Sequence, residues 1–278
     1  MNNILEVKNL SIDFATREGK FQAVDDISFN IENNKTLALV GESGSGKSVT
    51  AMSILQLLPR PQASYSKTSS IKFKGDEIID ASKDKLLNIR GNIVSMVFQE
   101  PMTSLNPVFT IGDQINEVHF IHSGISKKKA TKLTIDLLDK VGIPYPEISH
   151  KKYPHQLSGG QRQRVMIAMA LACKPKLLIA DEPTTALDVI VQAQILNIIN
   201  DLRKSLDMSV LLITHDLGVV QDFCDRVYVM YNGKILENSN IDQLFKNPQH
   251  QYTRDLLMTR PAVNEPGKRL PIIKGNYE

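Results

Sequence analysis

The 278-residue sequence has only two cysteines, Cys173 and Cys224, which lie far apart and form no Cys-x-x-Cys pair. This scarcity argues against a zinc site and a disulfide framework, and it makes a reducing cytoplasm the simplest compartment. Long apolar runs are also missing, since the longest covers about nine residues where a membrane-spanning helix needs about 20. The first residues form no basic and apolar leader, so we expect no signal peptide and a protein that is soluble by itself.

The sequence also lacks an excess of charge of either sign. Its 33 Lys and Arg residues stand against 30 Asp and Glu residues, which leaves a formal net charge of +3. Such a balance favours neither an electrostatic nucleic-acid binder nor an acidic tail. The short lysine run at 127–129 is interpreted as the solvated start of a helix. The length allows one large domain or two small ones.

Apolar runs of strand length alternate with helical patterns, which predicts an α/β fold with a parallel sheet. One helix is expected to stop at Pro59, and a helical insert is expected between Pro107 and Pro154, with Ser126 as the N-cap of one of its helices. Asn232-Gly233 predicts a β-hairpin. The other predicted elements are strands at 5–7 and 28–31 around a polar turn-forming segment, strands at 37–40, 71–73, 93–98, 177–180 and 210–214, a helix face at 191–202, and a short helix from Asp242.

One segment between a predicted buried strand and a predicted helix matches the pattern Gly-x-x-x-x-Gly-Lys-Ser/Thr. Glycines let backbone N–H groups turn toward a phosphate, and the helix that follows adds positive potential. Lys47 would reach the β- and γ-phosphate oxygens, and the Ser48 hydroxyl would bind Mg²⁺. The alternative, a flexible linker, does not suit a place between a buried strand and an amphipathic helix. The segment consists of Gly41, Glu42, Ser43, Gly44, Ser45, Gly46, Lys47 and Ser48.

Two carboxylates, Asp181 and Glu182, follow the apolar strand predicted at 177–180. Ligands of parallel sheets bind at the carboxyl ends of the strands, so both side chains are expected at a nucleotide site. Asp181 suits a Mg²⁺ ligand that acts through water, and Glu182 suits the residue that orients or deprotonates the attacking water. The alternative interpretation is an acidic pair that caps the next helix.

A second phosphate-binding device is the helix start formed by Ser158, Gly159, Gly160 and Gln161. Its N–H groups and its helix dipole favour an anion. One chain hardly needs two such devices for one nucleotide. With Leu157 before it, the segment resembles the signature of the ATP-binding cassette (ABC) family, in which two domains pair head to tail and each signature closes on the γ-phosphate held by the other domain.

Further motifs of that family follow in order, and the resemblance implies their roles. Gln99 resembles the Q-loop glutamine, which contacts Mg²⁺ and water and joins the core to the helical insert. Residues 184–188 resemble the D-loop at the dimer interface, and His215 resembles the switch histidine that reaches the γ-phosphate. Either Phe14 or Phe21 would be the aromatic that stacks on adenine, although each could equally be a core residue.

Longer stretches are similar to the ATP-binding subunits of oligopeptide and dipeptide permeases, and the likeness is greatest to the first cassette of microcin-C-type peptide importers. Asn34-Lys35 replaces the Gly-Glu of many relatives, a mild change because asparagine tolerates a left-handed backbone. The tail has no cysteine, so the iron–sulfur centre of some relatives is not expected. The similar stretches are 41–50 (GESGSGKSVT), 98–107 (FQEPMTSLNP), 153–168 (YPHQLSGGQRQRVMIA), 180–189 (ADEPTTALDV) and 247–253 (NPQHQYT).

The resemblance implies an α/β fold in which a P-loop NTPase (RecA-like) core carries an antiparallel β subdomain and an α-helical ABC-specific insert at about residues 107–165. The ATP-binding domain would cover residues 1–245. Residues 246–278 would form a C-terminal extension of the oligopeptide-permease type.

The implied activity is hydrolysis of ATP with Mg²⁺, which powers a membrane importer for peptides or related solutes from the cytoplasmic face of the inner membrane. The implied partners are a second ABC cassette subunit, two membrane permease subunits and, indirectly, an extracytoplasmic solute-binding protein, with no nucleic acid. A heterodimer of cassettes is favoured, and a homodimer is the runner-up. The segment of Gln99, Glu100 and Met102, with the insert, is expected to dock the membrane subunit.

Two other functions are weighed against this one. A soluble ABC ATPase that acts on nucleic acid or ribosomes commonly has a second cassette, a coiled-coil or zinc insertion, or a basic extension, and the sequence shows none of these. A degenerate cassette would only complete the site of a partner. The intact Lys47, Asp181 and Glu182 argue against that interpretation.

Overall fold

The structure is a computed structural model that describes residues 3–99, 104–185, 187–260, 263–264, 275 and 277. Within these residues the chain forms two units, one from the ranges 1–81 and 211–278 and the other from 82–210. Both contain helices and strands, so the predicted α/β class is confirmed. In the described part of the chain, no helix has both the length and the apolar character that crossing a membrane requires.

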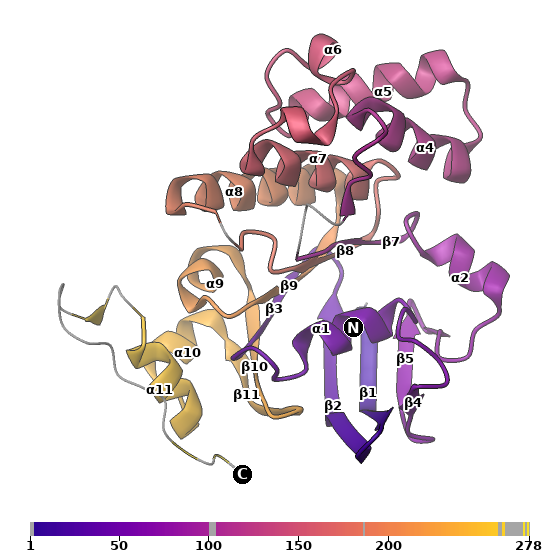
Figure 1. Ribbon diagram of the computed structural model, residues 1–278. Coiled ribbons are helices and arrows are strands. Elements are labelled where there is room, and N and C mark those ends of the chain that lie inside the picture. Colours follow the sequence, from indigo (N-terminus) through magenta and orange to yellow (C-terminus); the bar gives the residue numbers. More distant parts are fainter. Residues whose placement is uncertain are drawn as a thin grey trace. The chain divides into compact units, whose positions relative to one another are not determined.

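Two long antiparallel strands, β1 (Asn3–Thr16) and β2 (Gly19–Glu32), begin the first unit (Figure 1). The predicted strands at 5–7 and 28–31 lie within β1 and β2, but their predicted lengths are wrong, because pairing continues as far as Thr16 and Gly19. Backbone hydrogen bonds hold the end of a hairpin together even where its side chains are polar and exposed. The sheet order is β2-β1-β5-β6, and β4 also pairs with β1. The shorter strands are β4 (Ala63–Tyr65), β5 (Ser70–Phe73) and β6 (Asp76–Glu77).

The carboxylate of Glu77, in the last strand of this sheet, accepts several hydrogen bonds. Its oxygens accept from the Ser70 hydroxyl (2.5 Å) and from the backbone N–H groups of Ile71, Ile78 and Ile79 (2.9 to 3.0 Å). Burial raises the pKa of this carboxyl, but the hydrogen bonds outweigh burial and the pKa is lowered. A lowered folded-state pKa stabilises the protein above the unfolded pKa of about 4.3, and this contribution is lost as the pH falls through the folded pKa.

We expect Glu77→Ala to lower the free energy of unfolding by about 2 kcal/mol at pH 7, because donors to a charged acceptor lose their partner. The difference between parent and variant should shrink as the pH falls below about 4. Urea unfolding of both proteins between pH 7 and about pH 3.5 measures it. Glu18→Ala, at the exposed β1–β2 turn, is the control and should change nothing measurable. A difference that did not depend on pH would contradict the role of the charged carboxylate.

The first unit also contains the buried strand β3 (Thr36–Val40), which the apolar run 37–40 predicted. Asn34, just before it, has a φ of 60°, the left-handed conformation that we expected asparagine to tolerate there. β10 (Arg226–Tyr231) lies parallel to β3 and turns back into β11 (Lys234–Asn240). In this region the strand order is β11-β10-β3-β9, and β9 (Ser209–Thr214) begins in the other unit.

The turn between β10 and β11 is Asn232-Gly233, with φ values of 44° and 82°. Two positive φ angles define the turn that the Asn-Gly pair favours, so the predicted hairpin is confirmed. α1 (Lys47–Ile54) follows β3 after the glycine-rich loop, but it ends before Pro59. Gln56 already has a φ of 51°, so the helix stops at a left-handed residue without the help of proline.

Three further helices lie among the described residues of the first unit. They are α9 (Leu217–Phe223), α10 (Ile241–Lys246) and α11 (Gln251–Met258). The short helix expected from Asp242 is α10. α11 was not predicted, because no helix was expected within the C-terminal extension after the short helix.

In the part of the second unit that the structure describes, there are two parallel strands, the helices of the predicted insert and two helices outside it. Ser126 precedes α5, as expected for its N-cap, and α5 packs on both α4 and α7. The strands are β7 (Val94–Val97) and β8 (Leu177–Asp181). The helices are α2 (Lys83–Ile89), α4 (Ile111–Ser123), α5 (Lys127–Lys140), α6 (Pro146–Ser149), the 3-10 helix η1 (Pro154–Gln156), α7 (Gly159–Leu171) and α8 (Val189–Leu206).

Candidate functional site

The glycine-rich segment after β3 forms a loop that leads into α1. Gly44 has a φ of 82° and Gly46 a φ of 100°, values that side chains of L residues rarely allow. A Cβ added to Gly41 would lie 2.0 Å from the carbonyl oxygen of Met230, and one on Gly46 would lie 2.6 Å from that of Ala23. The backbones of β10 and β2 therefore require glycine at both ends of the loop.

Lys47, the first residue of α1, is 4% exposed, and its ammonium group lies within the loop. Nζ donates to the carbonyl oxygens of Gly41 (2.8 Å) and Glu42 (2.7 Å) and to Oγ of Ser45 (3.3 Å). From the hairpin turn, the Gly233 N–H donates to the carbonyl oxygen of Ser45 (3.0 Å). The loop is thus held around a buried cation at the start of a helix, which suits phosphate oxygens.

One contact of this loop is missing from the sequence-based prediction. The backbone N–H of Glu42 donates to the hydroxyl oxygen of Tyr252 (3.1 Å), a fully buried residue of α11. The Tyr252 ring packs against those of Tyr231 and Tyr277, with centroids 4.7 and 5.1 Å away. Burial raises the pKa of the Tyr252 hydroxyl to about 12, so the group is neutral at physiological pH. The stretch 247–253 contains this tyrosine, but nothing in its pattern indicated the loop as its neighbour.

In the second unit, the two predicted carboxylates stand at the end of β8. Asp181 is its last residue and is 5% exposed. Glu182 follows with a φ of 45°, an uncommon value for this residue type. Its Oε2 accepts from Nε2 of Gln99 (3.1 Å) and from Oγ1 of Thr185 (2.8 Å). The structure therefore brings together Gln99 and Glu182, two predicted site residues that are far apart in the sequence.

The predicted helix start at residues 158–161 is the beginning of α7. Oγ of Ser158 accepts the N–H of Gln161 (3.3 Å), and Oε1 of Gln161 accepts the N–H of Ser158 (3.0 Å). This reciprocal capping box orders the first turn of the helix. A Cβ on Gly160 would lie 2.9 Å from Cγ1 of Val191, so glycine here lets α8 approach α7 closely. The side chain of Gln161 is engaged in the cap.

The segment expected to be the D-loop leads into α8, and Ala186 lies outside the described residues. Oγ1 of Thr184 accepts from Nε2 of Gln192 (3.0 Å), and Asp188 caps α8. The next two side chains, Val189 and Ile190, are 79% and 72% exposed. Two neighbouring apolar side chains in water are a feature of contact surfaces.

His215 follows β9 in the first unit and is exposed. The polar residues beside it shape the chain, since Oγ1 of Thr214 accepts the N–H of Asp216 (3.0 Å) and the Asp216 carboxylate accepts the N–H of Gly218 (2.7 Å). The phosphate loop belongs to the same unit. Gln99, the β8 carboxylates and the α7 start belong to the other.

The two aromatic candidates for adenine stacking are cross-strand neighbours, because Phe14 of β1 pairs with Phe21 of β2. Phe14 is half-buried, and Phe21 is 57% exposed. Ala23, two residues after Phe21, is the residue whose carbonyl oxygen would clash with a Cβ on Gly46. Phe21 therefore lies on the strand that borders the phosphate loop, and it is more exposed than Phe14.

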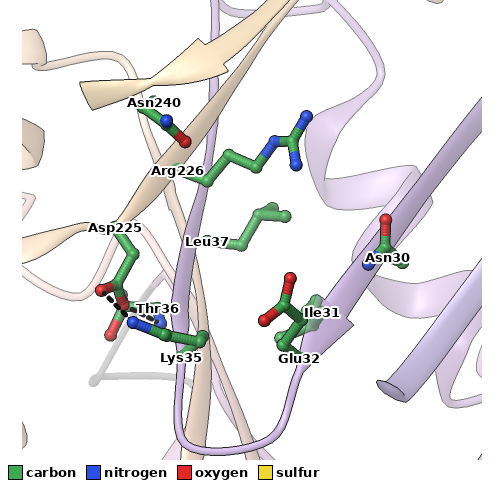
Figure 2. Close-up of a pocket in the computed structure, with 9 residues that line it drawn as sticks. All are labelled: Asn30, Ile31, Glu32, Lys35, Thr36, Leu37, Asp225, Arg226 and Asn240. Carbon is green, nitrogen blue, oxygen red and sulfur yellow. Dashed lines mark hydrogen bonds and ion pairs between the residues drawn. The ribbon is translucent and has the colours of Figure 1, made fainter. Parts of the chain in front are cut away.

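A cavity of about 220 Å³ lies at the opposite end of β3 (Figure 2). There Asp225 forms an ion pair with Nζ of Lys35 (3.1 Å) and accepts the N–H of Thr36 (2.8 Å), as the dashed lines show. Ligands of parallel sheets bind at the carboxyl ends of strands, and this cavity borders the amino end. It is therefore not the candidate nucleotide site.

The residues present fit ATP and Mg²⁺. The loop supplies a glycine cradle with one buried cation, which suits a polyphosphate. The Ser48 hydroxyl in the first unit, and the Asp181 carboxylate and the Gln99 amide in the second, each contain an oxygen atom, the type of donor that Mg²⁺ prefers.

Residues 24–185 match the protein-family model described as ABC transporter. The chain is 51% identical over 268 residues to the oligopeptide transport ATP-binding protein OppD of Bacillus subtilis, a match that covers 96% of this chain and 75% of that protein. It is also 51% identical to AppD of the same organism, named as an oligopeptide transport ATP-binding protein, over 99% of this chain and 84% of AppD. The peptidoglycan transport ATP-binding protein YejF of Agrobacterium fabrum is 54% identical over 95% of this chain, which spans 48% of YejF.

Solved structures of cassettes share the fold. A dimeric post-hydrolysis state of the ATP-binding cassette MJ0796, bound to ADP and Pi, has a TM-score of 0.76 at 27% identity, over 85% of this chain and 98% of that one. The structure of cbiO1 from Clostridium perfringens, part of the ABC transporter complex cbiONQ, has a TM-score of 0.74 at 28% identity, over 89% and 92%. These likenesses confirm the cassette fold.

Proposed function

The chain belongs to the ABC transporter family as an ATPase subunit that binds ATP with Mg²⁺, and we propose that its ATP hydrolysis drives the import of peptides or related solutes across a membrane. Peptides are proposed as the transported solute because the chain is 51% identical to oligopeptide transport ATP-binding proteins over nearly its whole length. The relatives described above are transport proteins, which favours transport over the nucleic-acid alternative. The finer likeness to microcin-C-type importers stays a prediction.

The proposed roles follow from the contacts in each unit. Lys47 and the loop N–H groups bind the β- and γ-phosphates, as the cradle around the Lys47 ammonium supports. Ser48, Asp181 and Gln99 hold Mg²⁺, which would neutralise charge on the phosphates. Glu182 orients the attacking water and accepts its proton. The bonds from Gln99 and Thr185 support this role, because they fix the carboxylate that must point at the water.

Three further assignments complete the site. His215 contacts the γ-phosphate, and its exposed place directly after the end of a buried parallel strand, β9, supports this assignment. Phe21 or Phe14 stacks on adenine, and the exposure of Phe21 favours it. Residues 246–278 act as a C-terminal extension of the ATP-binding domain at 1–245.

A complete site requires a second cassette, in this proposal, because the chain has one phosphate loop and one Ser158-Gly159-Gly160 start. The dimeric structure of MJ0796 and the exposed Val189 and Ile190 support pairing of cassettes. A different, homologous chain is the favoured partner. A second copy of this chain is the runner-up, because two-fold symmetry would also bring each loop to a partner's signature.

The helical insert carries the proposed docking surface for a membrane permease subunit. Backbone hydrogen bonds join the start of α4 to residues 150–152. The Ile111 N–H donates to the carbonyl oxygen of Lys152 (2.9 Å), and the Gly112 N–H donates to that of His150 (2.8 Å). Exposed apolar side chains flank this junction, which is a surface that a partner helix can cover. They are Val108, Phe109, Tyr145, Ile148 and Tyr153. Glu100 and Met102, also expected at this surface, lie outside the described residues.

A peptide-uptake experiment tests the proposal. In cells from which the gene for this chain has been deleted, the parent chain should restore uptake of labelled oligopeptides. The double variant Phe109→Ser, Ile148→Ser should lower uptake at least about tenfold, while its isolated ATPase rate stays within about twofold of the parent. ATPase activity and uptake are measured on the same variants.

Leu87→Ser is the matched control, because Leu87 is an equally exposed apolar residue of the same unit outside the insert. It should leave uptake unchanged. Failure of the parent chain to restore peptide uptake would overturn the cargo class. Full uptake by the double variant would overturn the docking surface alone.

A further inference from the structure

The residues after α10 are tied to β11 by one buried carboxylate. Glu237 is 7% exposed, and its two oxygens accept the backbone N–H groups of Gln249 (2.8 Å) and His250 (2.9 Å). His250 caps α11, since its Nδ1 accepts the N–H of Tyr252 (3.1 Å). α10 packs against β11, and α11 follows α10 along the chain (Figure 1). These polar contacts therefore fix the position of the start of α11.

This placement puts Tyr252 of α11 into the interior of the unit. Its side chain is fully buried between the rings of Tyr231 and Tyr277, so its hydroxyl has few possible partners. A buried tyrosine hydroxyl needs a hydrogen bond, and here it receives the backbone N–H of Glu42. The partner is a main-chain group of the phosphate loop, not a side chain of the surrounding helices.

Glu42 connects this tyrosine to the phosphate-binding lysine. Its N–H donates to Tyr252, while its carbonyl oxygen accepts from Nζ of Lys47 (2.7 Å). The N–H and the carbonyl oxygen of Glu42 are therefore both hydrogen-bonded, the first to Tyr252 and the second to Lys47. The Glu42 N–H also shares its peptide plane with the Gly41 carbonyl oxygen, which accepts from Nζ of Lys47 (2.8 Å), so a rotation of that plane that broke the bond to Tyr252 would move an oxygen that holds Lys47.

We propose that Tyr252 is a positioning residue for nucleotide binding, because its hydroxyl fixes the Glu42 backbone and orders the phosphate loop before the nucleotide arrives. The inference rests on the phosphate-loop role proposed above for residues 41–48. A loop that is already ordered loses less conformational entropy when it binds its ligand. Tyr252 thus raises affinity without touching the nucleotide, and its effect falls on binding rather than on the chemical step.

The test is Tyr252→Phe, which removes one oxygen atom and keeps the buried ring. In the full-length chain we expect the Kd for Mg-ADP and the KM for ATP to rise about fivefold, since one net hydrogen bond is lost, while kcat stays within about twofold. Hydrogen exchange provides a readout that needs no activity: the Glu42 amide should exchange faster in the variant, and amides of β3 should not. Calorimetry, steady-state kinetics and exchange followed by mass spectrometry measure these quantities.

Tyr277→Phe is the matched control. It removes a hydroxyl from the same aromatic cluster, but that hydroxyl bonds to Asp255 and not to the loop. Unchanged Kd and unchanged Glu42 exchange in Tyr252→Phe would overturn the inference, as would an equal rise of Kd in both variants. A failure of the parent chain to bind Mg-ADP would overturn the phosphate-loop role and the inference with it.

Discussion

Replacement of Glu182 by glutamine is expected to slow ATP hydrolysis by a factor of about 10² to 10⁴ while ATP still binds. Glutamine keeps the length of the side chain but loses the negative charge, so it cannot accept a proton from the attacking water. Positioned acid–base groups contribute about this factor, which corresponds to about 3 to 5 kcal/mol of activation free energy. The left-handed backbone of Glu182 and the bonds from Gln99 and Thr185 show that the carboxylate is held in one orientation.

Phosphate release by the purified variant measures the loss, and static light scattering measures a second consequence. Because ATP stays intact in the variant, Mg-ATP should hold two cassettes together, either two copies or this chain with its homologous partner. Glu147→Gln, an exposed acid in α6, is the control for the loss of one charge in the same unit. A Glu182→Gln rate close to that of the parent would show that another group activates the water. A variant that stayed monomeric with Mg-ATP beside its candidate partner would contradict the two-cassette site.

Lys47→Ala should act at an earlier step and weaken the binding of Mg-ADP and Mg-ATP about 10- to 100-fold. The ammonium group is buried within the loop and bonded to the carbonyl oxygens of Gly41 and Glu42. Hydrogen bonds to charged groups contribute about 1.5 to 3 kcal/mol each, which corresponds to this range of affinity. Alanine removes the cation that we propose to bind the phosphates and also the donor that holds the loop carbonyl groups.

Isothermal titration of parent and variant with Mg-ADP measures the affinity without any need for turnover. Lys35→Ala is the control, since this lysine is in the same unit and forms an exposed ion pair with Asp225 that contributes little. Equal affinity of Lys47→Ala and the parent would refute the phosphate-binding role of the loop. Circular dichroism separates loss of binding from loss of folding, because a folded variant keeps the spectrum of the parent.

The parts of the fold that the sequence predicted are those with a local physical cause. Four consecutive apolar residues predicted β3, and the Asn232-Gly233 pair predicted the hairpin, because its two residues adopt the positive φ angles that the turn demands. The loop before Lys47 was predicted from its own pattern of glycines between a buried strand and a helix.

Features that depend on distant contacts were not predicted. α11 is held by the bonds from Gln249 and His250 to Glu237, a residue of another element, and the local sequence carries no trace of that pairing. The contact of Tyr252 with the loop joins residues 210 positions apart. The full length of β1 and β2 was missed because polar side chains conceal paired strands when only apolar alternation is counted.

The turn between β10 and β11 has a practical consequence for anyone who wishes to label this protein. Tips of surface hairpins are the usual places for tags, fluorophores and inserted domains, because most of them tolerate extra residues. The tip of this hairpin is hydrogen-bonded to two other segments. The Gly233 N–H donates to the carbonyl oxygen of Ser45, and the Gly233 carbonyl oxygen accepts the N–H of Asp25 (2.9 Å). A reporter inserted at Asn232-Gly233 would disturb the phosphate loop. The exposed turn between Thr16 and Gly19 is the better place for an inserted reporter.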